Sequence, residues 1–108
     1  MYINVNGIRW GIVMVHSRSE LLRRSDGIIT LGVTDCNTFE VYLCNELENG
    51  LLYNVLCHEI CHVFVFSYGY YMTIEEEERL AQFIADFGRQ IVDGTDSIIK
   101  NLIKRMAS

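Results

Sequence analysis

Residues 51–67 read LLYNVLCHEICHVFVFS, and this stretch decides how the rest of the chain is organised. It is too long and too evenly apolar for a single strand, and Gly69 follows it as a residue that readily takes the left-handed conformation that ends a helix. The stretch therefore predicts a buried helix. Its start is ambiguous, because Asn45 and Asn49 are both suitable N-cap residues.

The chain before this helix has the pattern of a small sheet. Four runs rich in β-branched and aromatic residues occupy positions 2–5, 8–15, 28–34 and 39–44. Asn6-Gly7 separates the first two runs and is a strong signal for a type I′ hairpin. A polar connection with a helical turn at residues 19–23 leads to the second pair. Strands followed by helices predict an α+β fold with a small antiparallel or mixed four-stranded sheet.

The chain after residue 72 is predicted to be helical. Thr73 and Glu76 form a capping box that starts a helix. Apolar residues then recur at helical spacing and predict a stripe that faces the core: Leu80, Phe83, Ile84, Phe87 and Ile91. Gly94 is expected to end this helix, and residues 97–106 are expected to form a third, amphipathic helix.

Composition limits what the protein binds. The 108 residues suit one domain spanning residues 1–108, and the net charge of -5 argues against a nucleic-acid partner, which needs clustered Lys and Arg. No apolar run reaches the ~18–20 residues of a membrane span, and the first residues lack the pattern of a signal peptide. We therefore expect a cytoplasmic protein with no membrane partner and with its four cysteines reduced. The sequence leaves its oligomeric state open.

The predicted buried helix contains His58-Glu59-Ile60-Cys61-His62, an H-E-x-x-H motif. Residues four apart lie on one face of a helix, so both imidazoles can bind a single Zn²⁺. Glu59 then lies beside the metal and can act as the general base that takes a proton from a zinc-activated water. Burying two histidines and a glutamate among apolar residues is costly unless something satisfies them, which favours a metal over two core histidines.

A catalytic zinc site uses three protein ligands and leaves a fourth position open. The acidic run of residues 75–78 offers a third ligand, although such a run also suits the positive end of a helix dipole. Glu78 shares a helix face with the small residues Ala81 and Ala85, which allow another helix to approach closely. The sequence therefore favours Glu78 as the third ligand, with Glu77 in reserve.

The motif and the helix after it resemble the gluzincin arrangement, in which H-E-x-x-H is completed by E-x-x-(A/S/T)-(D/E), here residues 78–82. At this size the chain is similar to the minigluzincins and to short phage and prophage members of the ImmA/IrrE-like zinc peptidase group, over roughly residues 28–88. The resemblance implies a zincin-like fold, zinc ligands His58, His62 and Glu78, general base Glu59, and a zinc metallopeptidase that hydrolyses peptide bonds in an extended peptide or protein substrate.

The sequence departs from the family pattern at Gln82, where Asp or Glu usually orients a ligand histidine. An amide can still accept a hydrogen bond, but it brings no charge. This departure supports an alternative function, a catalytically weak or inactive phage or prophage interaction module that retains the fold.

Three further expectations concern the surroundings of the motif. Cys57 and Cys61 are predicted to pack as small hydrophobic residues; their spacing does not match C-x-x-C-H haem attachment, and a redox role is a weaker alternative. The strand at residues 39–44 is the candidate sheet edge for a peptide substrate. The residues that could donate to a reaction oxyanion are Tyr68, Tyr70 and Tyr71, each of which could instead be a packing aromatic.

Overall fold

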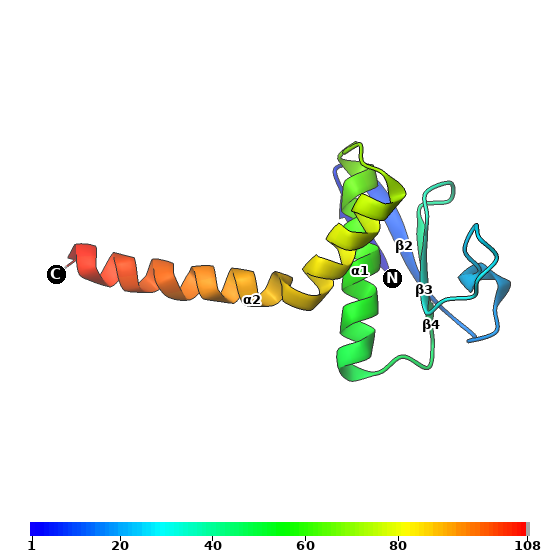
Figure 1. Ribbon diagram of the computed structural model, residues 1–108, viewed down its shortest axis with the longest axis horizontal. Helices are drawn as coiled ribbons and strands as arrows, with labels where there is room; N and C mark the ends of the chain where they lie inside the picture. The colour runs from blue at the N-terminus through cyan, green and yellow to red at the C-terminus, as the bar shows by residue number, and fades with distance from the viewer. Residues whose placement is uncertain (108) are drawn as a thin grey trace.

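The computed structural model describes residues 1–107 and has an α+β fold with a four-stranded mixed sheet and two α-helices. Figure 1 shows the sheet and α1 at one end of the molecule and most of α2 extending away from them. The elements in chain order are β1 (Tyr2–Val5), β2 (Ile8–Val15), the 3-10 turn η1 (Glu20–Leu22), β3 (Gly32–Asp35), β4 (Glu40–Cys44), α1 (Asn49–Ser67) and α2 (Ile74–Ala107).

The sheet has the strand order β1-β2-β4-β3. The β1–β2 and β3–β4 pairs are antiparallel, and β2 runs parallel to β4. The predicted hairpin turn is confirmed, since Asn6 and Gly7 both have positive φ angles, 47° and 79°. The expectation that residues 39–44 form a sheet edge is wrong. Strand β4 lies between β2 and β3, and the edge strand near α1 is β3.

The second strand pair is shorter than the sequence pattern predicts. Ile28, Ile29 and Leu31 lie before β3 and are between 42% and 56% exposed. Their β-branched and apolar character suits a strand, but of these residues only Ile29 forms a bridge, to Arg23. Packing and pairing, rather than propensity, therefore set where β3 begins.

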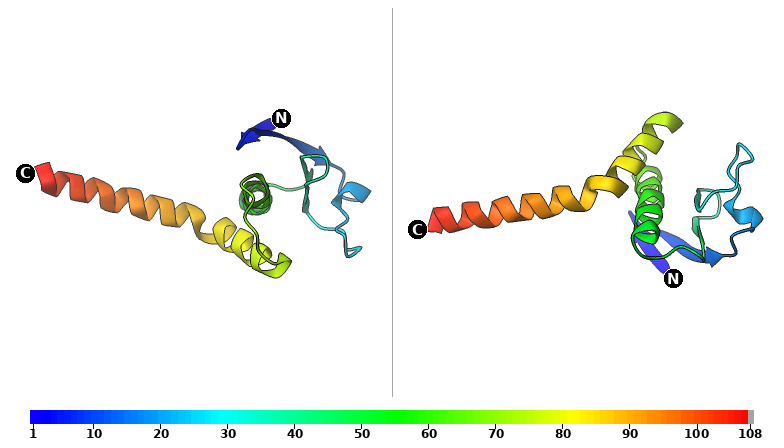
Figure 2. Two further views of the ribbon diagram at one scale, coloured as in Figure 1. Left: turned by 90° about the horizontal axis from the view of Figure 1, so that it is seen from above. Right: turned by 60° about the horizontal axis from the view of Figure 1, so that its bottom comes forward.

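The main core lies between the sheet and α1. Its buried residues include Trp10, Leu22, Val41, Leu43 and Val63. Trp10 is fully buried, and its indole N–H donates to the Ser67 hydroxyl at 3.0 Å, which ties the last turn of α1 to β2. The views in Figure 2 show α1 between the sheet and the first part of α2, so the motif helix contacts both.

Helix α1 has the length and apolar composition of a membrane span. It packs between the sheet and α2, where Glu59 and His62 are buried. Gly69 ends the helix with φ 68°, as predicted. Neither Asn45 nor Asn49 caps its start, because Glu48 holds the N-cap position without a side-chain hydrogen bond.

Strand β3 approaches α1 closely at Gly32. A Cβ atom on Gly32 would lie 2.9 Å from a Val55 methyl group and 3.1 Å from Cγ of Glu59. These distances are too short for ordinary van der Waals contact, so only glycine fits there without displacing the helix. The absence of a side chain at Gly32 therefore lets β3 lie directly against the motif residues of α1.

Helix α2 begins where the capping box predicts, because the Thr73 hydroxyl accepts a hydrogen bond from the Glu76 amide at 3.1 Å. The predicted break at Gly94 is wrong, since α2 continues as one helix to Ala107. A glycine inside a helix costs only about 1 kcal/mol relative to alanine, so a single glycine need not end a helix. The separate third helix is therefore the second half of α2.

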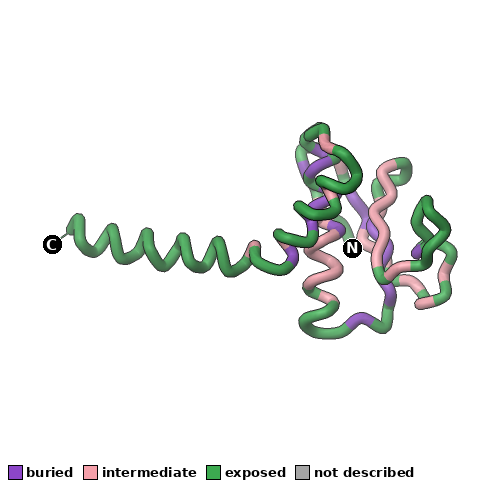
Figure 3. Tube along the Cα trace, in the orientation of Figure 1, coloured by how far each residue is buried: buried purple, intermediate pink, exposed green. Residues whose placement is uncertain are grey.

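The face of α2 that packs on α1 differs from the predicted apolar stripe. Ala81 and Ala85 are buried against α1, in agreement with the small-residue face inferred for Glu78. The stripe expected to face the core is mostly exposed, with Phe83 at 52% and Ile91 at 53%. Small residues allow the two helix backbones to approach; of the bulky stripe, Ile84 packs against the cluster of Cys61, Val65 and Ala81 between the helices. The tube in Figure 3 shows the projecting part of α2 exposed along its length.

Candidate metal centre

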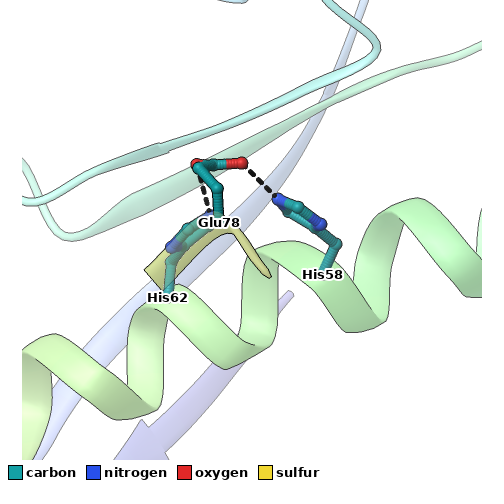
Figure 4. A group of neighbouring side chains, drawn as sticks. All are labelled: His58, His62 and Glu78. Atoms are coloured by element: carbon teal, nitrogen blue, oxygen red, sulfur yellow. Dashed lines mark hydrogen bonds and ion pairs between the residues drawn. The ribbon is translucent and has the colours of Figure 1, made fainter. Parts of the chain in front are cut away.

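Two turns of α1 and the first turns of α2 bring three metal-ligand side chains together. His58 and His62 lie on adjacent turns of α1, and Glu78 reaches them from α2, as Figure 4 shows. One ligand atom from each residue lies within 4.8 Å of the others. The two Glu78 carboxylate oxygens are each 3.0 Å from a histidine Nε2 atom, one from His58 and one from His62. The sequence-predicted residues therefore form one cluster.

The second nitrogen of each imidazole is held by another side chain of α2. His58 Nδ1 donates to Oε1 of Gln82 at 3.0 Å, and His62 Nδ1 donates to the Glu77 carboxylate. Glu77, the reserve ligand of the sequence analysis, thus orients His62 from the side opposite Glu78. Gln82 accepts the hydrogen bond that an acidic residue would accept at this position.

The orientation of the Gln82 amide follows from its other contacts. Its Nε2 group donates to Asn54 Oδ1 at 3.1 Å and to Asp86 Oδ1 at 2.9 Å. Both partners are acceptors, so the amide oxygen faces His58 and the proton of His58 lies on Nδ1. The Asp86 carboxylate lies one helical turn after Gln82 and accepts a hydrogen bond from its amide.

The donor set fits a metal cation. Each Nε2 atom lies 3.0 Å from an oxygen of the Glu78 carboxylate, which is an acceptor, so a proton or a metal cation must lie along each of these contacts. One cation bound by the two neutral imidazoles and the carboxylate can take the place of both protons. Two imidazole nitrogens and one carboxylate are the ligand types that Zn²⁺ takes in catalytic sites.

Glu59 is held beside the cluster and is not one of its three donors. The Thr34 hydroxyl of β3 donates to Glu59 Oε1 at 2.9 Å, and Glu59 is 7% exposed. Burial raises the pKa of the Glu59 carboxyl, and the hydrogen bond from Thr34 opposes that shift. The carboxylate is thus fixed in orientation and has an increased affinity for a proton.

The cluster opens into a cleft of about 970 Å³ between β3, α1 and α2. Val33, Thr34, Asp35 and Cys36 form its strand side, and the metal-ligand residues form its helix side. Tyr68, Tyr70 and Tyr71 do not line it. They follow the end of α1 and are 53% to 101% exposed, so none of these candidates is placed to donate to an oxyanion in the cleft.

The two cysteines of the motif helix lie away from the metal-ligand side chains. Cys61 is buried in a small apolar cluster with Val65 and Ala81. Burial raises the pKa of the Cys61 thiol, which makes it a poor nucleophile at neutral pH. Cys57 contacts the Ile84 carbonyl, and both cysteines are free thiols. Their surroundings are those of packing residues between α1 and α2.

Three residues that hold side chains of the site in place were not predicted from the sequence: Thr34, Asn54 and Asp86. Asn54 lies four residues before His58, so helical spacing alone places it on the same face of α1 as this ligand. Asp86 lies four residues after Gln82 and shares a face of α2 with it in the same way. The Asn54 amide also donates to Asp86 at 2.8 Å and links the two helices. Thr34 comes from a strand 25 residues away, and no local pattern indicates it.

Replacing Gln82 with leucine tests whether this amide positions His58. The variant loses the acceptor for the His58 Nδ1 proton, and such outer partners contribute about 10- to 100-fold to metal affinity. We expect zinc affinity, measured by competition with a chromophoric chelator, to fall by that factor in Gln82→Leu and to be retained in Gln82→Glu. The matched control is Gln90→Leu, an exposed site on the same helix. Unchanged affinity in Gln82→Leu would contradict the role given to Gln82.

Comparison of the chain with known protein families, with curated proteins and with solved structures finds no match.

Proposed function

We propose that the protein is a small zinc-dependent metallopeptidase of the gluzincin type, and that it acts in the cytoplasm. The observation that carries this proposal is the convergence of His58, His62 and Glu78 on one point, with Glu59 held separately beside it. A structural metal site needs no such additional carboxylate, whereas hydrolysis does. The resemblance of residues 58–62 and 78–82 to the gluzincin motifs supports the same conclusion.

His58, His62 and Glu78 are the residues that would hold the zinc ion. A zinc ion with an open position polarises a peptide carbonyl and lowers the pKa of water to about 7. Glu59 accepts the proton of the attacking water and passes it to the leaving amine nitrogen. Thr34 keeps the Glu59 carboxylate turned toward the cleft, because its hydroxyl donates to Oε1. Gln82 and Glu77 keep both imidazoles in the tautomer that exposes Nε2.

The proposed substrate is an extended polypeptide. Strand β3 is an edge strand, and its residues Val33–Asp35 line the cleft that holds the cluster. An edge strand presents unpaired backbone N–H and C=O groups to which a peptide can add as a further strand. A peptide bound along β3 passes in front of Glu59, because Thr34 of this strand contacts the Glu59 carboxylate.

The alternative is an interaction module that keeps the fold without turnover. The neutral Gln82 at the usual position of an acidic residue favours it. The two functions differ in one measurable property, the cleavage of an unfolded polypeptide such as reduced, alkylated casein by the zinc-loaded protein. We expect cleavage by the wild type and none by Glu59→Gln. Absence of cleavage by a zinc-loaded wild type would favour the module.

A further inference from the structure

The second half of α2 carries an exposed apolar face that contacts no other element of the described chain. Arg89 still stacks on the Tyr53 ring of α1; residues 90–107 extend beyond it as a single arm, and the molecule measures 59 Å along its longest axis against 30 and 27 Å along the others (Figure 1). Seven apolar side chains of this arm are between 46% and 85% exposed: Ile91, Val92, Ile98, Ile99, Leu102, Ile103 and Met106. An isolated helix of this length is marginally stable in water, and Gly94 weakens it further.

The apolar face has a regular spacing that suits a helical partner. Ile91, Thr95, Ile98, Leu102 and Met106 follow one another at intervals of four, three, four and four residues. The last three intervals span eleven residues in three turns, or 3.67 residues per turn, so the face stays on one side of the helix and forms a continuous seam. The remaining exposed apolar side chains of the arm widen one border of this seam. A second helix of the same length can cover it.

We propose that a second copy of this chain covers the apolar face, in an antiparallel pair of arms. In such a pair, a two-fold axis perpendicular to the helices passes between Ile98 and Ile99. A residue of one copy then lies at the same height as the residue of the second copy for which the two numbers add up to 197. Ile91 then meets Met106, Thr95 meets Leu102, and Ile98 meets Ile99 of the second copy. Every layer of the pair is filled by residues of the seam or, in the case of Ile99, of its apolar border, so the same surface serves both copies, as an isologous interface requires. The pair needs to remove at least about 1,000 Å² from water, which is the lower limit for a specific interface.

The charges of the arm favour the antiparallel direction. Asp93 and Asp96 lie in its first half, whereas Lys100, Lys104 and Arg105 lie in its second half. In the antiparallel pair, Asp96 of one copy lies within one residue's rise of Lys100 of the second copy, along the same border of the seam. In a parallel pair, each charged residue lies at the same height as the identical residue of the second copy, so like charges are level with one another.

The test is the mass of the full chain in solution, measured by sedimentation equilibrium. We expect the wild type to have twice the monomer mass of 12.5 kDa at tens of micromolar. Ile98→Glu with Leu102→Glu places charges in the seam and is expected to weaken dimerisation at least about 100-fold. Ser97→Glu is the matched control, since Ser97 lies on the opposite face, and it is expected to remain dimeric with unchanged circular dichroism.

A wild type that stays monomeric at several hundred micromolar would overturn the proposal. This holds even if the apolar face then binds another surface, such as an anionic vesicle. A dimer that persists in the double variant would overturn it as well. Asp96→Lys tests the direction, because it places two positive charges together at each end of an antiparallel pair. We expect about tenfold weaker dimerisation at low salt, restored by adding Lys100→Asp; no weakening would contradict the antiparallel arrangement.

Discussion

Glu59→Gln is expected to abolish peptide hydrolysis while leaving the fold and the zinc affinity unchanged. Glutamine keeps the shape of the side chain and an Oε1 atom that can accept the hydrogen bond from Thr34. Its amide cannot take a proton from water, and a general base contributes about 10²- to 10⁴-fold to such reactions. The substitution also removes the need to bury a charge, so we expect no loss of thermal stability.

The measurement is the rate of cleavage of a fluorescently labelled unfolded polypeptide by the zinc-loaded proteins. Glu76→Gln serves as the control, because it makes the same change of charge at an exposed position in the first turn of α2. We expect the control to match the wild type. Comparable cleavage by Glu59→Gln and the wild type would show that Glu59 is not the general base.

Alanine at any one of His58, His62 and Glu78 is expected to remove tight zinc binding and the stability that zinc supplies. A ligand that binds only the folded state stabilises it by about 2.7 kcal/mol at 100 times its dissociation constant. For a domain of about 100 residues, each kcal/mol raises Tm by roughly 4–8 °C. We therefore expect zinc to raise the Tm of the wild type by roughly 10–20 °C, and to leave the Tm of each variant nearly unchanged.

His16→Ala is the matched control for the two histidine variants. His16 follows the end of β2 and accepts a hydrogen bond from the Arg18 amide, outside the metal-ligand cluster. Its Tm should rise with zinc as much as that of the wild type. A zinc-dependent rise that survives in His62→Ala would place the metal elsewhere on the chain.

The candidate site was predictable because its information is local. His58 and His62 are four residues apart on a helix that the apolar run predicts, and Glu78 follows from the small residues Ala81 and Ala85 on the same face. In each case, helical periodicity alone fixes which side chains share a face. The role of Glu77 was harder to assign, because spacing places it near the cluster but does not show which imidazole nitrogen it reaches.

The sheet edge was not predictable because strand order depends on contacts between distant residues. Residues 39–44 are the last strand before α1, and chain order alone suggested an edge. The parallel pairing of β2 with β4 inserts this strand into the middle of the sheet and leaves β3 at the edge. Nothing local in either strand encodes that pairing.

The length of α2 and the face that it packs on α1 also could not be predicted from the pattern of this helix alone. Gly94 was expected to end the helix, yet α2 continues through it, because a single glycine costs a helix only about 1 kcal/mol. The bulky stripe through Phe83 and Ile91 looked like a core face because large apolar residues are usually buried. In this domain the face with Ala81 and Ala85 packs on α1. Helical periodicity therefore showed which residues share each face, but not which of the two faces is buried.

The most direct test of the account is the zinc content of the wild-type protein, purified without chelators and measured by inductively coupled plasma mass spectrometry. The geometry of His58, His62 and Glu78 predicts one zinc ion per chain, and none in a variant with all three replaced by alanine. A wild type that carries no zinc, and that takes up none when titrated with zinc at micromolar concentrations, would contradict the account.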